Sequence, residues 1–171
     1  DQNIGRVLDK LRAQGKLDNT LIMFASDNGG CAEDTTAVVF SEAAKDVGQV
    51  ASFDTVGKSW AIVQNTPFRF YKNYSHEGGI CTPFIVSWPK GIKKTGGFND
   101  QVSHFIDIMP TVAEVGDAAY PESYNGTDIV PMQGVSLLNA FKGKAVKREK
   151  PVFWHWIQGG AIREGNMKAV H

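Results

Sequence analysis

Two short segments of the sequence carry side chains that could do chemistry, and each borders an apolar run. The first is Ser26-Asp27-Asn28-Gly29-Gly30. Asp27 supplies a carboxylate and Asn28 an amide oxygen, and such oxygen donors suit Ca²⁺ or Mg²⁺ better than zinc. The two glycines permit a sharp turn in which both side chains could reach one ion. Because these residues are also the commonest in turns, the segment on its own fits a plain turn at least as well.

The second segment runs from Thr66 to Ile80 and places a lysine, Lys72, shortly before another apolar run. A lysine at this position could hold an oxyanion beside a metal and add positive charge where negative charge builds up in a transition state. The alternative is a solvated lysine on a loop. On this segment alone, the solvated lysine is the favoured interpretation.

The elements that must position these segments are predicted from the spacing of apolar residues. A helical spacing predicts a helix over residues 2–14, which Gly15 ends. The unbroken apolar runs Thr20–Ser26 and Pro83–Trp88 predict strands buried on both faces. Helix, loop and buried strand are typical of an α/β protein, in which ligands bind at the carboxyl edge of the sheet.

The rest of the chain divides into a helical part and a strand-rich end. Residues 27–66 are predicted to be mostly irregular, with a short helix near Ser41–Val47, and further helices are expected at Val102–Val115 and Val135–Phe141. Glycine turns separate three short predicted strands: Val152–Ile157, Ala161–Arg163 and Met167–Val170. We therefore expect an α/β region over residues 1–145 and the beginning of a small antiparallel β subdomain over residues 146–171, with Lys142–Lys150 as a linker.

Composition excludes some classes of partner. Eighteen basic residues balance 18 acidic ones, so no global field favours nucleic acid or an anionic membrane. No apolar run reaches the roughly 18 residues of a membrane helix. The two cysteines, Cys31 and Cys81, could form a disulfide or remain thiols. Because the chain begins inside a predicted helix without Met and ends in a predicted strand, we expect both ends to be cuts.

Taken together, the motifs resemble the arylsulfatase family of type I sulfatases, in the alkaline-phosphatase superfamily. Three strings carry the resemblance in order along the chain: LDNTLIMFASDNGG, NTPFRFYKNYSHEGGICTPFIVSWPKGI and SHFIDIMPTVAEV. The resemblance covers nearly the whole chain. It implies the C-terminal part of a sulfatase, with part of a mixed sheet flanked by helices and then the start of an antiparallel subdomain.

The resemblance also implies roles for individual residues. Asp27 and Asn28 would be two ligands of an active-site Ca²⁺, with Mg²⁺ the less favoured ion, and Lys72 would contact the sulfate group of the substrate. Lys72 stands five residues before Glu77-Gly78-Gly79, which is the family spacing. His76 would either line the substrate pocket or serve the structure, and Glu77 would shape the loop.

Other positions are expected to be structural or depart from the family. Asp107 and Pro110 belong to a helix-packing signature without a catalytic role. The family nucleophile is a formylglycine made from a C/S-x-P-x-R motif, which is expected upstream of this chain. Cys81-Thr82-Pro83-Phe84-Ile85 has isoleucine where that motif has arginine, so Cys81 is rejected as the nucleophile. Gln133 also departs, since the family often has aspartate there.

The expected function is calcium-dependent hydrolysis of a sulfate ester, such as an aryl sulfate or a sulfated glycan. This chain alone is expected to be inactive and to bind calcium weakly, because Ca²⁺ takes about 6 to 8 oxygen ligands and only two are evident here. The alternatives are a phosphate or phosphonate ester hydrolase of the same superfamily and a non-catalytic binding module. By resemblance alone, the location is expected to be periplasmic or secreted. Asn73 and Asn125 stand in glycosylation sequons, which are short and often accidental, and neither is taken as evidence of a eukaryotic source.

Overall fold

The computed structural model describes residues 1–33, 56–157 and 159–171, and these form two units. The first unit comprises Asp1–Phe24 and Ile85–Pro151, and the second comprises Ala25–Phe84 and Val152–His171. The helix predicted near Ser41–Val47 lies outside the described residues. The predicted domain boundary after residue 145 remains a prediction.

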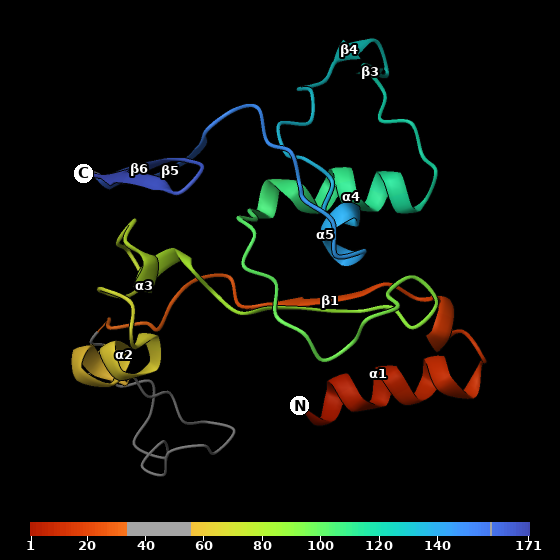
Figure 1. Cartoon of the computed structure of the whole chain (residues 1–171), viewed down its shortest axis with the longest axis horizontal. Helices are drawn as coiled ribbons and strands as arrows, with labels where there is room; N and C mark the ends of the chain where they lie inside the picture. Colours follow the sequence, from red (N-terminus) through yellow and green to blue (C-terminus); the bar gives the residue numbers. More distant parts are fainter. Residues whose placement is uncertain (34–55, 158) are drawn as a thin grey trace. The chain divides into compact units, whose positions relative to one another are not determined.

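The first unit begins as the apolar spacing predicts. Helix α1 (Gln2–Ala13) is followed by Gly15 with φ of +65°, a conformation that glycine adopts without the strain of a side chain. After the short 3₁₀ helix η1 (Leu17–Asn19) comes strand β1 (Ile22–Ala25), which pairs with β2 (Phe84–Ser87) in a two-stranded sheet (Figure 1). Both predicted strands are therefore confirmed, each shorter than its apolar run.

The prediction that these strands are buried on both faces is wrong for the described structure. Phe24 in β1 is 51% exposed, and Ile85 in β2 is 60% exposed. An apolar run records which side chains prefer burial, whereas burial itself depends on the segments that pack against them. A strand can thus be recognised locally while its covering cannot.

The helix predicted over Val102–Val115 begins later than its apolar pattern. Residues 102–104 are not helical; η2 (Phe105–Asp107) comes first, and α4 (Ile108–Val115) follows it (Figure 1). His104 is extended and forms a capping box, in which its Nδ1 accepts a hydrogen bond from the Ile106 amide and Asp107 accepts one from the His104 amide. The cap thus sets the start of the helical segment. Pro110 lies in the first turn of α4, where a proline is tolerated.

Asp107 is the centre of a buried polar cluster in this unit. Its side chain is 0% exposed; Oδ1 accepts a hydrogen bond from the Val135 amide at 2.9 Å and Oδ2 lies 2.5 Å from Nη2 of Arg148. Thr111, also 0% exposed, accepts a hydrogen bond from the Leu137 amide at 2.9 Å. The cluster ties α4 to the segment before α5 (Leu138–Phe141). The expectation that Asp107 serves packing agrees with these contacts.

Two features of the first unit differ from the sequence analysis. Strands β3 (Ser123–Tyr124) and β4 (Thr127–Asp128) form a small antiparallel hairpin that was not predicted. Its signal is Asn125-Gly126, both with positive φ, a pair that favours a two-residue hairpin turn. The helix predicted over Val135–Phe141 is confirmed only in its last turn, α5.

The second unit contains helices where an irregular segment was predicted. Helix α2 (Gly57–Asn65) lies within residues 27–66, which were predicted to be mostly irregular. That prediction is wrong for residues 57–65. A short helix, α3 (Glu77–Ile80), forms the end of the segment that carries Lys72 (Figure 1). Between them the Thr66–Pro67 peptide bond is cis. Helix α2 was missed in the sequence because its apolar stripe is weak and it buries only Ala61.

The strand-rich end is confirmed. Strands β5 (Val152–Trp156), β6 (Gly159–Glu164) and β7 (Met167–Val170) form an antiparallel sheet in the order β5-β6-β7. Trp156 pairs with Gly159, and Glu164 pairs with Met167 across a turn at Gly165. Within the described residues, no helix has the length and apolar character that a membrane crossing requires. Cys31 and Cys81 are both free thiols.

Candidate functional site

The two segments singled out in the sequence lie directly against each other. The Gly29 amide donates a hydrogen bond to the Gly79 carbonyl at 2.9 Å. A Cβ atom on Gly29 would lie 1.8 Å from the Gly78 carbonyl oxygen, and one on Gly78 would lie 2.1 Å from the Phe70 carbonyl oxygen. Neither glycine has a positive φ, and it is the close approach of the two backbones that excludes a side chain at both positions.

A second contact joins the Lys72 backbone to the same turn. The Lys72 amide donates to the Gly30 carbonyl at 3.0 Å, and the Gly30 amide donates to Oδ1 of Asn65 at 2.9 Å. Asn65 also donates through Nδ2 to the Phe70 carbonyl at 3.1 Å. Asn65, the last residue of α2, therefore holds both segments. The structure thus brings the Asp27-Asn28 turn and the Lys72 segment together through their backbones.

Asp27 and Asn28 fit the ligand set of a hard cation. The Asp27 side chain is exposed, and no hydrogen bond or ion pair engages it within the described residues. The Asn28 amide donates through Nδ2 to the Gly29 carbonyl at 2.8 Å, which leaves its Oδ1 to accept or ligate. A carboxylate and an amide oxygen are donors that Ca²⁺ takes. Among residues 1–33, 56–157 and 159–171, no three His, Cys, Asp or Glu side chains gather as a metal site.

The Lys72 ammonium lies in a small polar network. Its Nζ is 3.4 Å from Oε2 of Glu33, and Oε1 of Glu33 accepts a hydrogen bond from Nδ2 of Asn73 at 3.2 Å. Nζ is also 4.0 Å from the Cys31 sulfur. The hydrogen bond from Asn73, then those from Cys31 and Lys72, lower the pKa of Glu33. Glu33 therefore stays ionised and faces the lysine with a negative charge.

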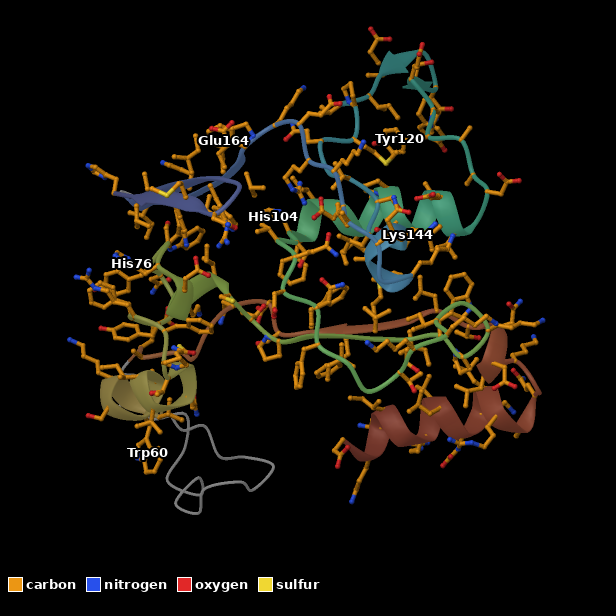
Figure 2. The ribbon with its side chains drawn as sticks, in the orientation of Figure 1. Trp60, His76, His104, Tyr120, Lys144 and Glu164 are labelled. Atoms are coloured by element: carbon orange, nitrogen blue, oxygen red, sulfur yellow. The ribbon has the colours of Figure 1, made fainter. Side chains whose placement is uncertain are left out.

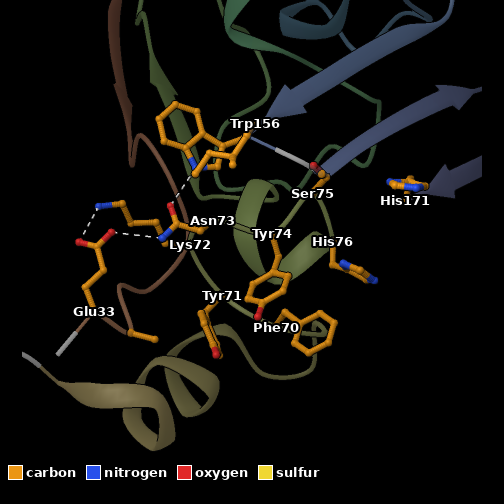
Figure 3. A pocket seen from close by; sticks show the side chains of 13 residues that line it. Glu33, Phe70, Tyr71, Lys72, Asn73, Tyr74, Ser75, His76, Trp156 and His171 are labelled. Carbon is orange, nitrogen blue, oxygen red and sulfur yellow. Dashed lines mark hydrogen bonds and ion pairs between the residues drawn. The ribbon is translucent and has the colours of Figure 1, made fainter.

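Asn73 extends this network to the C-terminal sheet. Its Oδ1 accepts a hydrogen bond from Nε1 of Trp156 at 3.1 Å. Asn73 has φ of +78°, a left-handed conformation that asparagine tolerates better than most residues. Figure 3 shows the indole of Trp156 on one side of Asn73 and Glu33 with Lys72 on the other. The four side chains form one continuous chain of polar contacts.

These residues line a pocket of about 600 Å³. Three segments of the second unit make its wall: Ala32 and Glu33, the run 70–76, and the strand ends that carry Trp156, Ile157, Gly159 and His171 (Figure 3). A volume of this size is within the roughly 300–1,000 Å³ that small-molecule sites occupy. Lys72 and His76, predicted as substrate-binding residues, therefore line the same pocket.

His76 occupies an aromatic corner of that pocket. Its ring meets Phe70 edge to face at a centroid distance of 4.7 Å, and Phe70 stacks on Tyr74 at 4.4 Å (Figures 2 and 3). Burial of the ring lowers the pKa of His76, and the charges of Arg69 and Lys168 lower it further. Its buried Nδ1 has no hydrogen-bond partner in the part of the chain that the structure describes. A neutral imidazole can exchange a hydrogen bond with a ligand but brings no charge to bind an anion.

Glu77 and Cys81 both lie outside the lining of the pocket. Oε1 of Glu77 lies 2.5 Å from Nζ of Lys168 and 4.0 Å from Nη1 of Arg163, so it faces β6 and β7 rather than the pocket. Desolvation of the Cys81 thiol and the nearby Glu77 carboxylate raise the pKa of Cys81. A raised pKa disfavours the reactive thiolate, which agrees with rejecting Cys81 as a nucleophile.

Three residues of this site were not singled out from sequence as site residues: Glu33, Asn73 and Trp156. Glu33 and Trp156 stand outside both predicted segments, and Asn73 was considered only as a sequon. Their hydrogen bonds join residues as far as 83 positions apart. No local pattern carries such a signal, because each partner is set by the paths of separate loops.

Comparisons with known proteins identify the family of the chain. A family model described as sulfatase matches residues 1–118. An uncharacterised sulfatase of Schizosaccharomyces pombe is 33% identical over 184 aligned residues, which cover 100% of this chain and 33% of that protein. An arylsulfatase of Klebsiella aerogenes is 33% identical over 146 residues, covering 80% of this chain and 31% of that protein. A steryl-sulfatase of Homo sapiens is 27% identical over 158 residues, covering 91% of this chain and 22% of that protein. The chain thus spans a third or less of the length of these relatives.

Proposed function

The chain belongs to the sulfatase family, and from this premise we propose that the full-length protein hydrolyses sulfate esters with the help of a divalent cation. One observation supports the proposal above others. The backbone of Lys72, the predicted sulfate-binding residue, is hydrogen-bonded to Gly30, two residues beyond the predicted metal ligand Asn28. A positive side chain and a pair of cation ligands on adjoining backbone is the arrangement that binding and polarising a sulfate group requires.

Each residue has a distinct part in this proposal. Asp27 and Asn28 would hold Ca²⁺, with Mg²⁺ the less favoured ion, and a formylglycine upstream of this chain would supply the nucleophile. The cation provides Lewis-acid stabilisation of charge on the sulfate oxygens. Lys72 binds the same oxygens and is worth more as the negative charge on them grows in the transition state. Glu33 holds the lysine side chain between reactions, and Asn73 holds Glu33.

We further propose that this chain by itself is inactive and binds calcium weakly. The described residues offer two obvious oxygen ligands, whereas Ca²⁺ takes about 6 to 8. Turnover of a sulfate ester by the 171-residue chain alone would contradict this proposal. Location in the periplasm or outside the cell is proposed on family grounds, and cell fractionation of the native host tests it.

The test uses the full-length protein, produced together with a formylglycine-generating enzyme. Hydrolysis of an aryl sulfate is compared with hydrolysis of the matching aryl phosphate, before and after removal of Ca²⁺ with a chelator. Asp27→Ala and Lys72→Ala are the test variants. Asp100→Ala and Lys58→Ala are matched controls, because both side chains are exposed and lie outside the pocket.

The expected result is calcium-dependent sulfate release that each test variant lowers by at least about a hundredfold in kcat/KM, the usual loss for a group that stabilises developing charge. The controls are expected to stay within about twofold of wild type. A preference for the phosphate would favour a sister hydrolase of the superfamily instead. Absence of both activities in a protein whose formylglycine is verified by mass spectrometry would favour a non-catalytic binding module.

A further inference from the structure

The pocket beside Lys72 has a feature that sulfate binding does not explain. Sulfate is a small anion, whereas the pocket measures about 600 Å³ and extends from Lys72 to Trp156 and Ile157. A sulfate ester has a second part, the alcohol that leaves when the ester is cleaved. The space next to the sulfate-binding lysine is therefore available to that alcohol.

The wall of this space is mainly aromatic. Phe70, Tyr71 and Tyr74 form one side, where Phe70 and Tyr74 stack at 4.4 Å and Tyr71 meets Tyr74 edge to face at 5.2 Å. Trp156 contributes the other side from the end of β5 (Figure 3). Its ring is held by the hydrogen bond from Nε1 to Asn73, yet the residue is 56% exposed. An indole fixed at its polar edge and open on its face is suited to stack on a flat ligand.

The backbone around the pocket is held in sparsely populated conformations. Phe70 has φ of +66° and Ile157 has φ of +53°, and neither residue type adopts such values without cost. The value at Ile157 is the more costly, since its side chain is β-branched. Conformations of this kind persist where surrounding contacts impose them, and they gather at ligand sites. At this pocket they position Trp156 and the aromatic side opposite it.

Four polar side chains of the wall, those of Glu33, Lys72, Asn73 and Trp156, are already paired with each other. Both ends of the Asn73 amide are engaged, one by Trp156 and one by Glu33, and Glu33 also faces Lys72. Desolvation of the Tyr71 hydroxyl raises its pKa, and its interaction with the Tyr74 hydroxyl raises it further. A sugar would bring several hydroxyl groups that each need a partner when water is excluded.

Among the described lining side chains, one buried polar atom lacks a partner, Nδ1 of His76. That atom can exchange a hydrogen bond with one polar group of a ligand. An unpaired polar group discriminates between two ligands more strongly than a small difference in apolar contact does. The wall thus favours a flat ligand with few polar groups.

From these observations we propose that the pocket binds the alcohol part of the sulfate ester and that Trp156 selects a planar aromatic alcohol over a sugar. This inference rests on the proposed function. Trp156 supplies the stacking surface, Asn73 fixes the orientation of its ring, and Lys72 holds the sulfate at the other end. Asn73 is a positioning residue, because it acts on the ligand through Trp156.

The first experiment measures binding without catalysis, by calorimetry on the full-length protein with free 2-naphthol and, separately, with free N-acetylglucosamine as probes. We expect 2-naphthol to bind and Trp156→Ala to weaken it by about tenfold, the scale of a lost aromatic stacking contact. Trp156→Phe keeps an aromatic face but loses the bond to Asn73, so a loss of about two- to fivefold is expected. Phe98→Ala, which removes a fully exposed aromatic side chain outside the pocket, is the matched control.

The second experiment measures kinetics with 2-naphthyl sulfate and with methyl sulfate, whose alcohol is too small to reach Trp156. Trp156→Ala should raise KM about tenfold for the naphthyl ester and change it less than twofold for the methyl ester. Asn73→Ala should change KM for the naphthyl ester by the same factor as Trp156→Phe. Asn73→Asp, which retains an acceptor for Nε1 of Trp156, should recover part of this loss. This rescue separates a positioning role from a general loss of structure.

The outcomes distinguish the two proposals. Binding of 2-naphthol that Trp156→Ala leaves unchanged, or tighter binding of the sugar that depends on Trp156, would overturn the inference about the pocket. Absence of hydrolysis for both esters would instead overturn the proposed sulfatase activity, whatever the calorimetry shows. If Trp156→Ala lowers the melting temperature by several degrees, Trp156→Phe alone decides the question, and an unchanged affinity in that variant together with unchanged selectivity overturns the proposal.

Discussion

Nζ of Lys168 in β7 lies 2.5 Å from Oε1 of Glu77 in α3. This ion pair holds the C-terminal sheet to the helix at the end of the segment that carries Lys72. The Lys168 side chain is 11% exposed and that of Glu77 is 34% exposed, so water screens this pair only in part. Lys168 also lies over the ring of Trp154 at 5.2 Å. The sheet that carries Trp156 is thereby fixed to the segment that carries Lys72 and Asn73.

Glu77→Gln should therefore lower the stability of the protein. The amide keeps one hydrogen-bond acceptor for Lys168 but loses the charge, and the expected loss in free energy of unfolding is about 1 to 2 kcal/mol. Chemical denaturation monitored by circular dichroism measures it. Glu164→Gln, at an exposed carboxylate on β6, is the control and should change stability by less than about 0.5 kcal/mol. Equal losses in both variants would contradict the role given to Glu77.

Removal of the Glu33 charge should tighten anion binding at Lys72. The carboxylate competes with an anion for the ammonium, and its lowered pKa keeps it ionised at neutral pH. In Glu33→Gln, inhibition by inorganic sulfate should strengthen by about two- to fivefold, the scale of an exposed ion pair. Inhibition constants at low ionic strength measure this change. Glu149→Gln, an exposed carboxylate outside the pocket, should leave the constant as it is, and weaker inhibition in Glu33→Gln would show that orientation of Lys72 outweighs competition.

A methyl group on Gly29 should be poorly tolerated. Its Cβ would lie 1.8 Å from the Gly78 carbonyl oxygen, so the two segments would have to separate. Gly29→Ala is expected to cost about 3 kcal/mol or more of stability, or to prevent soluble expression. Gly5→Ala is the matched control, because nothing lies within 4 Å of its Cβ and alanine favours the helix by up to about 1 kcal/mol. Thermal melting of both variants tests the difference.

The buried carboxylate of Asp107 should be essential for folding of its unit. Asp107→Ala leaves Arg148 and two backbone amides without their acceptor, and breaking a buried pair in this way costs about 3–5 kcal/mol. Asp107→Asn keeps an acceptor but loses the charge, so a smaller loss is expected. Denaturant unfolding distinguishes the variants, and Glu114→Ala, at an exposed position in α4, serves as the control.

His104 should make the stability of the protein sensitive to acid. Burial lowers its pKa below the ordinary 6.5, with Asp107 opposing this effect and Arg148 adding to it. Its Nδ1 accepts a hydrogen bond from the Ile106 amide, which requires the unprotonated atom. Since the unfolded state binds the proton more readily, stability falls as pH drops below about 6.5 and stops falling below the pKa of the folded state.

His104→Asn should remove this part of the pH dependence, because asparagine can cap the turn but does not titrate. Melting temperatures between about pH 5 and pH 7 provide the measurement. Ser103→Ala, at the neighbouring exposed position, is expected to retain the wild-type slope. A slope that persists in His104→Asn would assign the acid sensitivity to another group.

Much of the fold followed from local patterns. The apolar spacing of residues 2–14 and the β-rich runs of the C-terminal end correspond to α1 and to β5, β6 and β7. The start of α4 did not follow, because the His104 cap outweighs an apolar pattern that continues upstream. Helix α2 was missed because a single buried alanine leaves almost no periodic signal.

The sequence by itself determined the family, the two chemical segments and the glycine pairs, since those depend on residue type and spacing alone. The contacts of Glu33 with Lys72 and of Asn73 with Glu33, and the place of Trp156 in the same pocket, became evident from the tertiary structure alone. The difference lies in how far apart along the chain the contacting residues stand. A motif records what a short stretch of chain can do, whereas hydrogen bonds between distant loops depend on where folding places both partners, and no short stretch of chain contains that information.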